Sequence, residues 1–225
     1  PFTETAIYYG MSVVMRKIAA LLNEQADVQH YEQLSVSIQS AFHQKYWDEQ
    51  AISYATGSDT ALSMPIAIGL APDQHHNDLV EKLVRQIAER GYQTTAGDVG
   101  YRYLLLALSR AGRSDVIYRM SQVRDKPSYG YQITHGATTL TEAWDGPTVG
   151  KSQNHFMLGH LEEWLFTGLA GMDYRYETET DRYNIMIKPY MPDDMKWAEA
   201  WQQLRPGYAR VRWERDERDE LSLTV

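Results

Sequence analysis

One stretch of the chain, residues 129–155, holds most of the side chains that could do chemistry. It contains two aromatic rings, two carboxylates and an amide–imidazole pair, namely Tyr129, Trp144, Glu142, Asp145 and Asn154-His155. Aromatic rings can stack on the C–H faces of a sugar, and short polar side chains can bond its hydroxyl groups. This pattern is therefore typical of a sugar pocket. Solvated loop acids around a core tryptophan would explain the same residues, and composition alone favours that alternative.

The composition limits the class of protein. A chain of 225 residues with 43% hydrophobic residues forms one large domain, or one domain plus a small one. The net charge of -8 argues against nucleic acid and anionic membrane surfaces as partners. No apolar run approaches the length of a membrane span. The first nine residues lack the pattern of a signal peptide, and because a signal can be removed, the compartment stays open.

Metal and cofactor chemistry is not predicted. The chain has no cysteine, which excludes a disulfide framework, a thiol nucleophile and a cysteine zinc site. His155 and His160 are five residues apart, so a helix would point them roughly 140° apart. The adjacent pair His75-His76 also diverges. Neither a G-x-S-x-G elbow nor a P-loop pattern is present.

Helical periodicity runs through the first 172 residues. Apolar positions at helical spacing, together with capping residues and terminal glycines, predict about seven helices, over 3–24, 27–47, 61–70, 71–91, 99–112, 115–123 and 153–169. A short extended piece is expected at 52–54. The segment 61–70 is apolar on nearly every side, which predicts a buried helix.

The pattern changes after Met172. Apolar and polar residues then alternate over 183–188, 197–204, 208–214 and 220–225, with turns at 192–194 and 206–207. This alternation predicts antiparallel strands. We therefore expect a helical domain over 1–172 and a small β domain over 173–225. Because the last predicted strand reaches residue 225, we expect that β domain to be incomplete.

Helical hairpins that repeat every 40 residues or so predict an α-solenoid or an α/α toroid. The polar loops at 92–98 and 124–153 are the longest. Long ordered loops commonly carry function, so we expect the site to lie there.

Four motifs then carry a family resemblance. They are a TTG-type loop at 94–100, a Pro-Ser-aromatic-Gly-Tyr segment at 127–131, the sequence GATTLTEAWD at 136–145, and Asn154-His155 before the last predicted helix. In this order they resemble the C-terminal half of the bacterial α-L-rhamnosidases, inverting glycoside hydrolases built on a six-hairpin α/α toroid. The later strands resemble the start of that family's C-terminal β domain. The resemblance covers essentially the whole chain.

The resemblance implies a fold and a set of roles. The fold would be a mainly α, partial (α/α)6 toroid followed by an antiparallel β domain, and the ligand a rhamnose-containing oligosaccharide or glycoside. Glu142 aligns with the family's general base, and His155 with a residue that bonds sugar hydroxyls. Trp144 would wall the pocket. The remaining candidates for hydroxyl contacts, or for orienting the base, are Asp98, Tyr129 and Asn154.

The chain departs from the family in three places, which leaves the exact sugar open. Thr141 stands where the family usually has an aromatic residue, Gly97-Asp98 stands where a large apolar residue is usual, and the loop after Asp145 is short. The motif that holds the general acid is absent from this sequence. Seven helices are also too few for six hairpins.

These gaps predict a C-terminal part of a longer enzyme. The missing N-terminal half would be the partner of this chain. Without that half, we expect the 225-residue chain to be catalytically silent. The apolar helix at 61–70 would then need a partner surface or would self-associate.

Two other functions stay open at this point. One is a carbohydrate-binding or scaffold module that has kept the helical fold and lost catalysis. The other is a different α/α-toroid enzyme, such as an unsaturated glucuronyl hydrolase or a polysaccharide lyase. A lyase would need a Tyr/His/Asn site and would not need Glu142.

Overall fold

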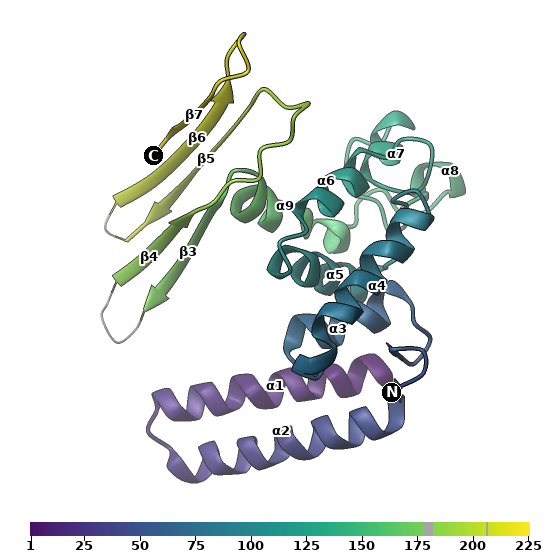
Figure 1. Cartoon of the computed structure of the whole chain (residues 1–225), viewed down its shortest axis with the longest axis vertical. Helices are drawn as coiled ribbons and strands as arrows, with labels where there is room; N and C mark the ends of the chain where they lie inside the picture. The colour runs from purple at the N-terminus through teal and green to yellow at the C-terminus, as the bar shows by residue number, and fades with distance from the viewer. Residues whose placement is uncertain (178–181, 206) are drawn as a thin grey trace.

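The computed structural model describes residues 1–177, 182–205 and 207–225 (Figure 1). Helices fill the first three quarters of the chain: α1 Phe2–Leu21, α2 Gln25–Tyr46, α3 Asp59–Ile68, α4 His76–Glu89, α5 Asp98–Arg110, α6 Ser114–Gln122, α7 Tyr129–Thr134, α8 Gly146–Val149 and α9 Leu161–Trp164. Shorter turns are η1 Asp73–His75 and η2 Phe156–Leu158, and α9 continues into a π-helical segment, η3 Leu165–Leu169. A mainly α fold of helical hairpins is thus confirmed.

Strands follow the helices, as predicted. Every pairing is antiparallel: β1 Trp47–Asp48 with β2 Ser53–Tyr54, β3 Met172–Glu177 with β4 Arg182–Ile187, and β5 Trp197–Leu204 with β6 Gly207–Arg215, which also pairs with β7 Leu221–Thr224. The four strands predicted after residue 182 are confirmed. The strand β3 was not predicted, although its alternation begins directly after Gly171. Of the predicted turn at 206–207, residue 206 lies outside the described residues.

Helix α3 forms the centre of the helical core. The Ser58 hydroxyl accepts a hydrogen bond from the Ala61 N–H (3.3 Å), which caps the helix. Every residue of α3 except Thr60 and Ile68 is buried. Helix α5 approaches so closely that a Cβ on Gly100 would lie 1.9 Å from the Thr60 hydroxyl. The predicted burial of 61–70 is therefore confirmed, but α4 and α5 supply the covering surface that we expected from another molecule.

The segment before the sheet differs from the predicted helix at 153–169. His155 is extended, with φ -138° and ψ 98°, and helical structure begins only at Phe156. The prediction that Asn154-His155 opens a helix is wrong, because the His155 N–H donates to the Leu140 carbonyl (2.9 Å) instead of starting a helical turn. Two short helices, α7 and α8, lie within the stretch predicted as a loop.

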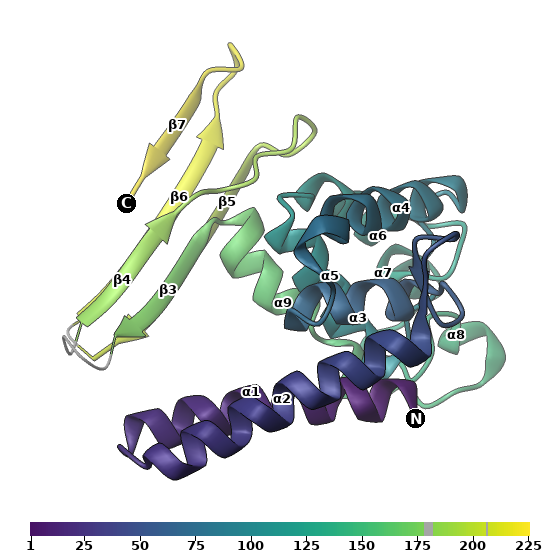
Figure 2. The same ribbon diagram turned by 60° about the horizontal axis from the view of Figure 1, so that its bottom comes forward.

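The sheet packs on the end of the last helix. The indole N–H of Trp213 in β6 donates to the Leu169 carbonyl (2.8 Å), and its side chain is fully buried. Gly171 has φ +76°, and a Cβ there would lie 2.1 Å from the Pro189 nitrogen. Figure 2 shows the strands extending from this junction, beyond the helical part. The domain boundary at 172/173 stays a prediction.

Within the described part of the chain, none of the helices has both the length and the apolar character of a membrane span.

Candidate active site

Two backbone segments, 140–142 and 152–155, run alongside each other. The Glu142 N–H donates to the Ser152 carbonyl (2.9 Å), and the His155 N–H donates to the Leu140 carbonyl (2.9 Å). The chain between them makes an excursion through α8 and returns. Glu142 and His155 are therefore held on adjacent segments although thirteen positions separate them in the sequence.

Glu142 faces a hollow of about 310 Å³. Its walls come from two loops that are far apart in the sequence. One wall holds Glu142, Ala143, Trp144 and Asp145, and the other holds Gln93, Thr94, Thr95 and Gly97, with Pro127 and Leu158 between them. The Glu142 carboxylate is half-buried and accepts a long hydrogen bond from the Ser152 N–H (3.4 Å). Two carboxylates, Glu142 and Asp145, thus share one hollow, and no Lys or Arg is among its lining residues.

Trp144 is one of the lining residues, but most of its side chain is buried and connects the two loops that form the hollow. Its side chain is only 7% exposed, and its indole N–H donates to the Ala96 carbonyl (2.7 Å). The rings of Tyr101 and Tyr129 meet it edge-on, with centroids at 4.7 and 5.0 Å. The hydrogen bond from Trp144 to Ala96 joins the loop that carries Glu142 to the loop at 93–97. A sugar could contact only the small exposed part of the ring.

Tyr129 lies in the core behind the hollow. Its hydroxyl donates to the Leu158 carbonyl, and burial raises its pKa to about 12. Tyr101, which is fully buried beside it, also has its pKa raised well above the ordinary value, first because of burial and then because of Tyr129. Both tyrosines therefore support the fold behind Trp144, and Tyr129 does not reach the lining of the hollow.

The other sequence-predicted residues lie around the hollow and not in its lining. His155 is half-buried, and Asn154 is exposed with its N–H donating to the Ser152 hydroxyl (3.3 Å). Asp98 begins α5 and is half-buried. The structure thus brings Glu142 and Trp144 to one hollow, with His155 on the neighbouring segment. Asp98, Tyr129 and Asn154 are not among the residues that face it.

An anchor for the wall at 93–97 was missed in the sequence. The buried Asp59 carboxylate accepts hydrogen bonds from Arg90 (2.5 and 2.6 Å), Gln86 (2.6 Å) and Thr95 (2.7 Å). Thr95 itself lines the hollow. The sequence does not reveal this role, because nothing in a single sequence connects Asp59 with residues 27 to 36 positions away.

The departure at Thr141 has a packing counterpart. Thr141 is fully buried, and its hydroxyl donates to the Ala143 carbonyl (2.5 Å). Gly146 lies so close that a Cβ there would be 2.8 Å from the Thr141 Cβ. An aromatic ring at position 141 would not fit this arrangement, so the backbone next to Glu142 is packed around a small side chain.

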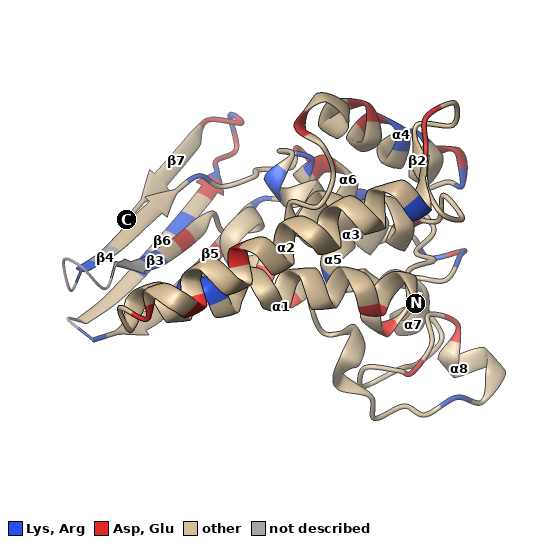
Figure 3. Cartoon of the chain, turned by 90° about the horizontal axis from the view of Figure 1, so that it is seen from below, with Lys and Arg blue, Asp and Glu red and all other residues tan. Residues whose placement is uncertain are grey.

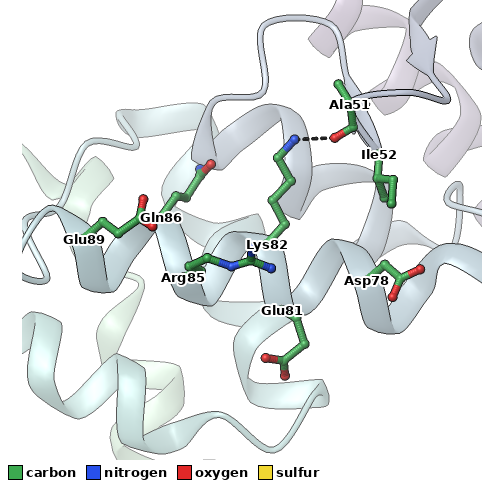
Figure 4. Close-up of a pocket in the computed structure, with 8 residues that line it drawn as sticks. All are labelled: Ala51, Ile52, Asp78, Glu81, Lys82, Arg85, Gln86 and Glu89. Carbon is green, nitrogen blue, oxygen red and sulfur yellow. Dashed lines mark hydrogen bonds between the residues drawn. The ribbon is translucent and has the colours of Figure 1, made fainter.

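A larger hollow, of about 520 Å³, lies elsewhere, between α4 and the segment after β1 (Figure 4). Lys82 crosses it and donates to the Ala51 carbonyl (2.6 Å). Its other charged side chains, Asp78, Glu81, Arg85 and Glu89, come from one helix. None of the predicted site residues lines it. Across the described residues, no group of three His, Asp or Glu side chains is placed to hold a metal ion.

Helical hairpins that end in an antiparallel sheet place the chain in the class of mainly α proteins built from helical hairpins. Residues 1–169 match the model of the bacterial α-L-rhamnosidase six-hairpin glycosidase domain. The chain therefore belongs to that family, and its helices form part of an (α/α)6 toroid.

Individual relatives agree with this assignment. An α-L-rhamnosidase of Formosa agariphila is 25% identical over 221 residues, which are 93% of this chain and 23% of that protein. The structure of an α-L-rhamnosidase from Dictyoglumus thermophilum has a TM-score of 0.83 at 30% identity, covering 94% of this chain and 24% of that one.

The α-L-rhamnosidase of Streptomyces avermitilis, solved in complex with L-rhamnose, has a TM-score of 0.82 at 25% identity, covering 95% of this chain and 21% of that one. The chain thus spans about a quarter of the length of the relatives it matches.

Proposed function

We propose that this chain supplies the general-base side of the active site in an inverting α-L-rhamnosidase that removes terminal α-L-rhamnose from plant or microbial glycans and glycosides. The observation that carries the proposal is that Glu142 lines a hollow which it shares with Asp145 and which no Lys or Arg lines, on a chain that belongs to the rhamnosidase family. The relatives named above are α-L-rhamnosidases, and one of them binds L-rhamnose.

Inverting hydrolysis requires two carboxyl groups on opposite sides of the sugar, roughly 6.5–9.5 Å apart. Glu142 would take a proton from a water molecule as that water attacks the anomeric carbon. The general acid, which protonates the leaving oxygen, would come from the part of the enzyme that precedes this chain. His155 on the adjacent segment would bond sugar hydroxyls. Trp144 would hold the two loops that shape the hollow.

A lyase mechanism is less well supported by the geometry. A lyase base would be a tyrosine or histidine next to the substrate, and the first candidate in the key stretch is Tyr129. Its hydroxyl is engaged with the Leu158 carbonyl, and its pKa is raised to about 12 by burial. Such a group is a poor base near neutral pH.

The test is Glu142→Gln in the full-length parent enzyme, assayed with an aryl α-L-rhamnoside. Loss of a general base is expected to lower kcat by about 10²–10⁴-fold with little change in KM. The matched control is Glu162→Gln, an exposed glutamate of α9, which should leave kcat unchanged. NMR of the first product formed would show inversion at the anomeric carbon. Full activity of Glu142→Gln would exclude the assigned role.

The isolated 225-residue chain gives a second readout. We expect no turnover, because the acid is missing. Turnover by this chain that disappears in its Glu142→Gln variant would show that it carries its own acid, for which Asp145 in the same hollow is the first residue to test.

A further inference from the structure

The three-stranded sheet β5–β6–β7 has two different faces. The inward positions of β5 and β6 include Ala200, Val211 and Trp213, which are buried against the end of the helical part. The outward positions include Trp197, Trp201 and Tyr208, which are 55, 63 and 74% exposed. The inner face thus packs against the helical part, while large aromatic rings on the outer face are exposed to solvent.

The outer face has a regular order. Trp197 is opposite Glu214, Glu199 opposite Arg212, Trp201 opposite Arg210, and Gln203 opposite Tyr208. Successive outward residues of β5 are therefore aromatic, acidic, aromatic and amide. At about 3.3 Å per residue, Trp197 and Trp201 lie roughly 13 Å apart along the strand. These outward positions of β5 and β6 carry no aliphatic side chain.

Ion pairs fix the polar groups between the rings. Arg210 binds Glu199 through two hydrogen bonds (3.1 and 2.9 Å). Arg212 bridges Glu199 (3.2 Å) and Glu214 (2.7 Å), and its guanidinium lies 4.9 Å from the centre of the Trp197 ring. In Figure 3, blue and red segments on β6 mark its arginines and its glutamate. Exposed pairs of this kind contribute only about 0–1 kcal/mol each, so the stability of the sheet does not explain them.

We infer that this outer face, which we call the aromatic ladder (Trp197, Glu199, Trp201, Tyr208, Arg210 and Arg212), binds a neutral polysaccharide chain along β5. Indole and phenol rings offer flat apolar surfaces to sugar C–H groups, and the fixed carboxylate and guanidinium edges offer bonds to hydroxyls. One sugar unit of an extended chain is about 5 Å long, so two rings this far apart would contact units of one chain that are two or three positions apart, with the polar groups facing the units between them. Counting Glu214, which also pairs with Arg212, the two arginines and two glutamates of this face cancel in charge, which fits an uncharged ligand.

A second copy of this chain is a poorer occupant of the same face. A protein interface would have to desolvate Glu199 and Glu214 together with their arginines, and buried ion pairs often fail to recover that cost. A polysaccharide leaves these side chains partly in water. The aromatic ladder also lies at the opposite end of the molecule from α7 and α8 in both views (Figures 1 and 2), so it is separate from the hollow at Glu142.

Native affinity electrophoresis of the 225-residue chain tests this inference. Gels would contain xyloglucan or galactomannan, which are neutral, or polygalacturonate, which is anionic. We expect retardation in at least one neutral gel and none in polygalacturonate. Trp197→Ala/Trp201→Ala should weaken the Kd by roughly tenfold or more, because both stacking surfaces are lost. Tyr8→Ala, which removes an exposed aromatic ring from α1, is the matched control and should bind as the parent chain does.

Circular dichroism would confirm that the variants are folded, and oxidative footprinting would report protection of Trp197 and Trp201 by the polysaccharide in the unmodified chain. Absence of retardation in every neutral gel, or retardation that the double variant retains, would overturn the inference. So would a dimer in sedimentation velocity that the double variant dissociates. Glu142→Gln should not alter binding, so this result is independent of the catalytic proposal.

Discussion

Helices α1 and α3 are both rich in apolar residues, but their surroundings differ. Helix α3 has ten residues, and all of them except Thr60 and Ile68 are buried. Helix α1 has twenty residues and buries only Ala6, Ser12 and Ala19. Seven large apolar side chains of α1 stay exposed: Ile7, Tyr8, Met11, Val14, Met15, Ile18 and Leu21. The apolar content of a helix therefore does not determine whether the helix is buried. Its burial depends on which other elements of the chain pack against it.

The reason is visible in Figures 1 and 2. Helix α3 lies among α1, α4 and α5, whereas the hairpin of α1 and α2 extends away from the helical part. One face of α1 packs on α2, and the opposite face carries the exposed side chains. We had expected the segment 61–70 to need an outside partner. In the structure, α3 is covered and α1 has the uncovered apolar face. We therefore propose that this face of α1 contacts the rest of the toroid.

The largest expected effect is in α3. Leu62→Ala should lower the free energy of unfolding by roughly 3 kcal/mol, because the fully buried side chain leaves a cavity. Urea denaturation followed by circular dichroism would measure the change. A loss below 1 kcal/mol would mean that α3 is not the centre of the core, and the contrast with α1 would then fail.

A smaller effect is expected at the start of α3. Asp59→Asn should cost roughly 2 kcal/mol, since Arg90 and Gln86 lose a charged acceptor. The hydrogen bond between Thr95 and the charged carboxylate would also be lost, so hydrogen exchange should rise over residues 92–97. The same exchange rates in Asp59→Asn and in the parent chain would show that the carboxylate does not anchor this wall of the hollow.

The smallest effect on stability is expected in α1. Met11→Lys should change the free energy of unfolding by no more than about 0.5 kcal/mol, because Met11 is 59% exposed. If the uncovered face drives self-association, sedimentation velocity should show fewer dimers in this variant than in the parent chain. A large loss of stability would contradict the exposed position of the helix.

Periodicity in the sequence predicted the long elements and missed the short ones. The apolar segment 61–70 and the alternating strands after residue 182 carry enough repeats to define a helix or a strand. Helix α7 has six residues and α8 has four, too few for a 3.6-residue period to show. Only local signals mark them, namely the Ser128 cap on α7 and Pro147 at the start of α8.

The chemical types of the candidate residues do not show which of them line the hollow. Glu142 lines a hollow, and its role as the general base stays a prediction. Trp144 and Tyr129 have the right chemistry for a sugar wall, but their indole and phenol groups are bonded to the Ala96 and Leu158 carbonyls in the core. A sequence alone does not show whether an aromatic ring faces a ligand or supports the residue that does. Asp59 was missed because its contacts depend on the tertiary fold.

The paired segments 140–142 and 152–155 also bear on how such a chain could change during evolution. Their two backbone hydrogen bonds close the base of the excursion through α8, whose residues 148–152 are exposed. Closing a loop twice as long costs only about 0.6 kcal/mol more. Insertions at this tip could therefore change the exposed surface of the excursion while Glu142 and His155 keep their relative positions. The length of the excursion can thus vary without moving Glu142.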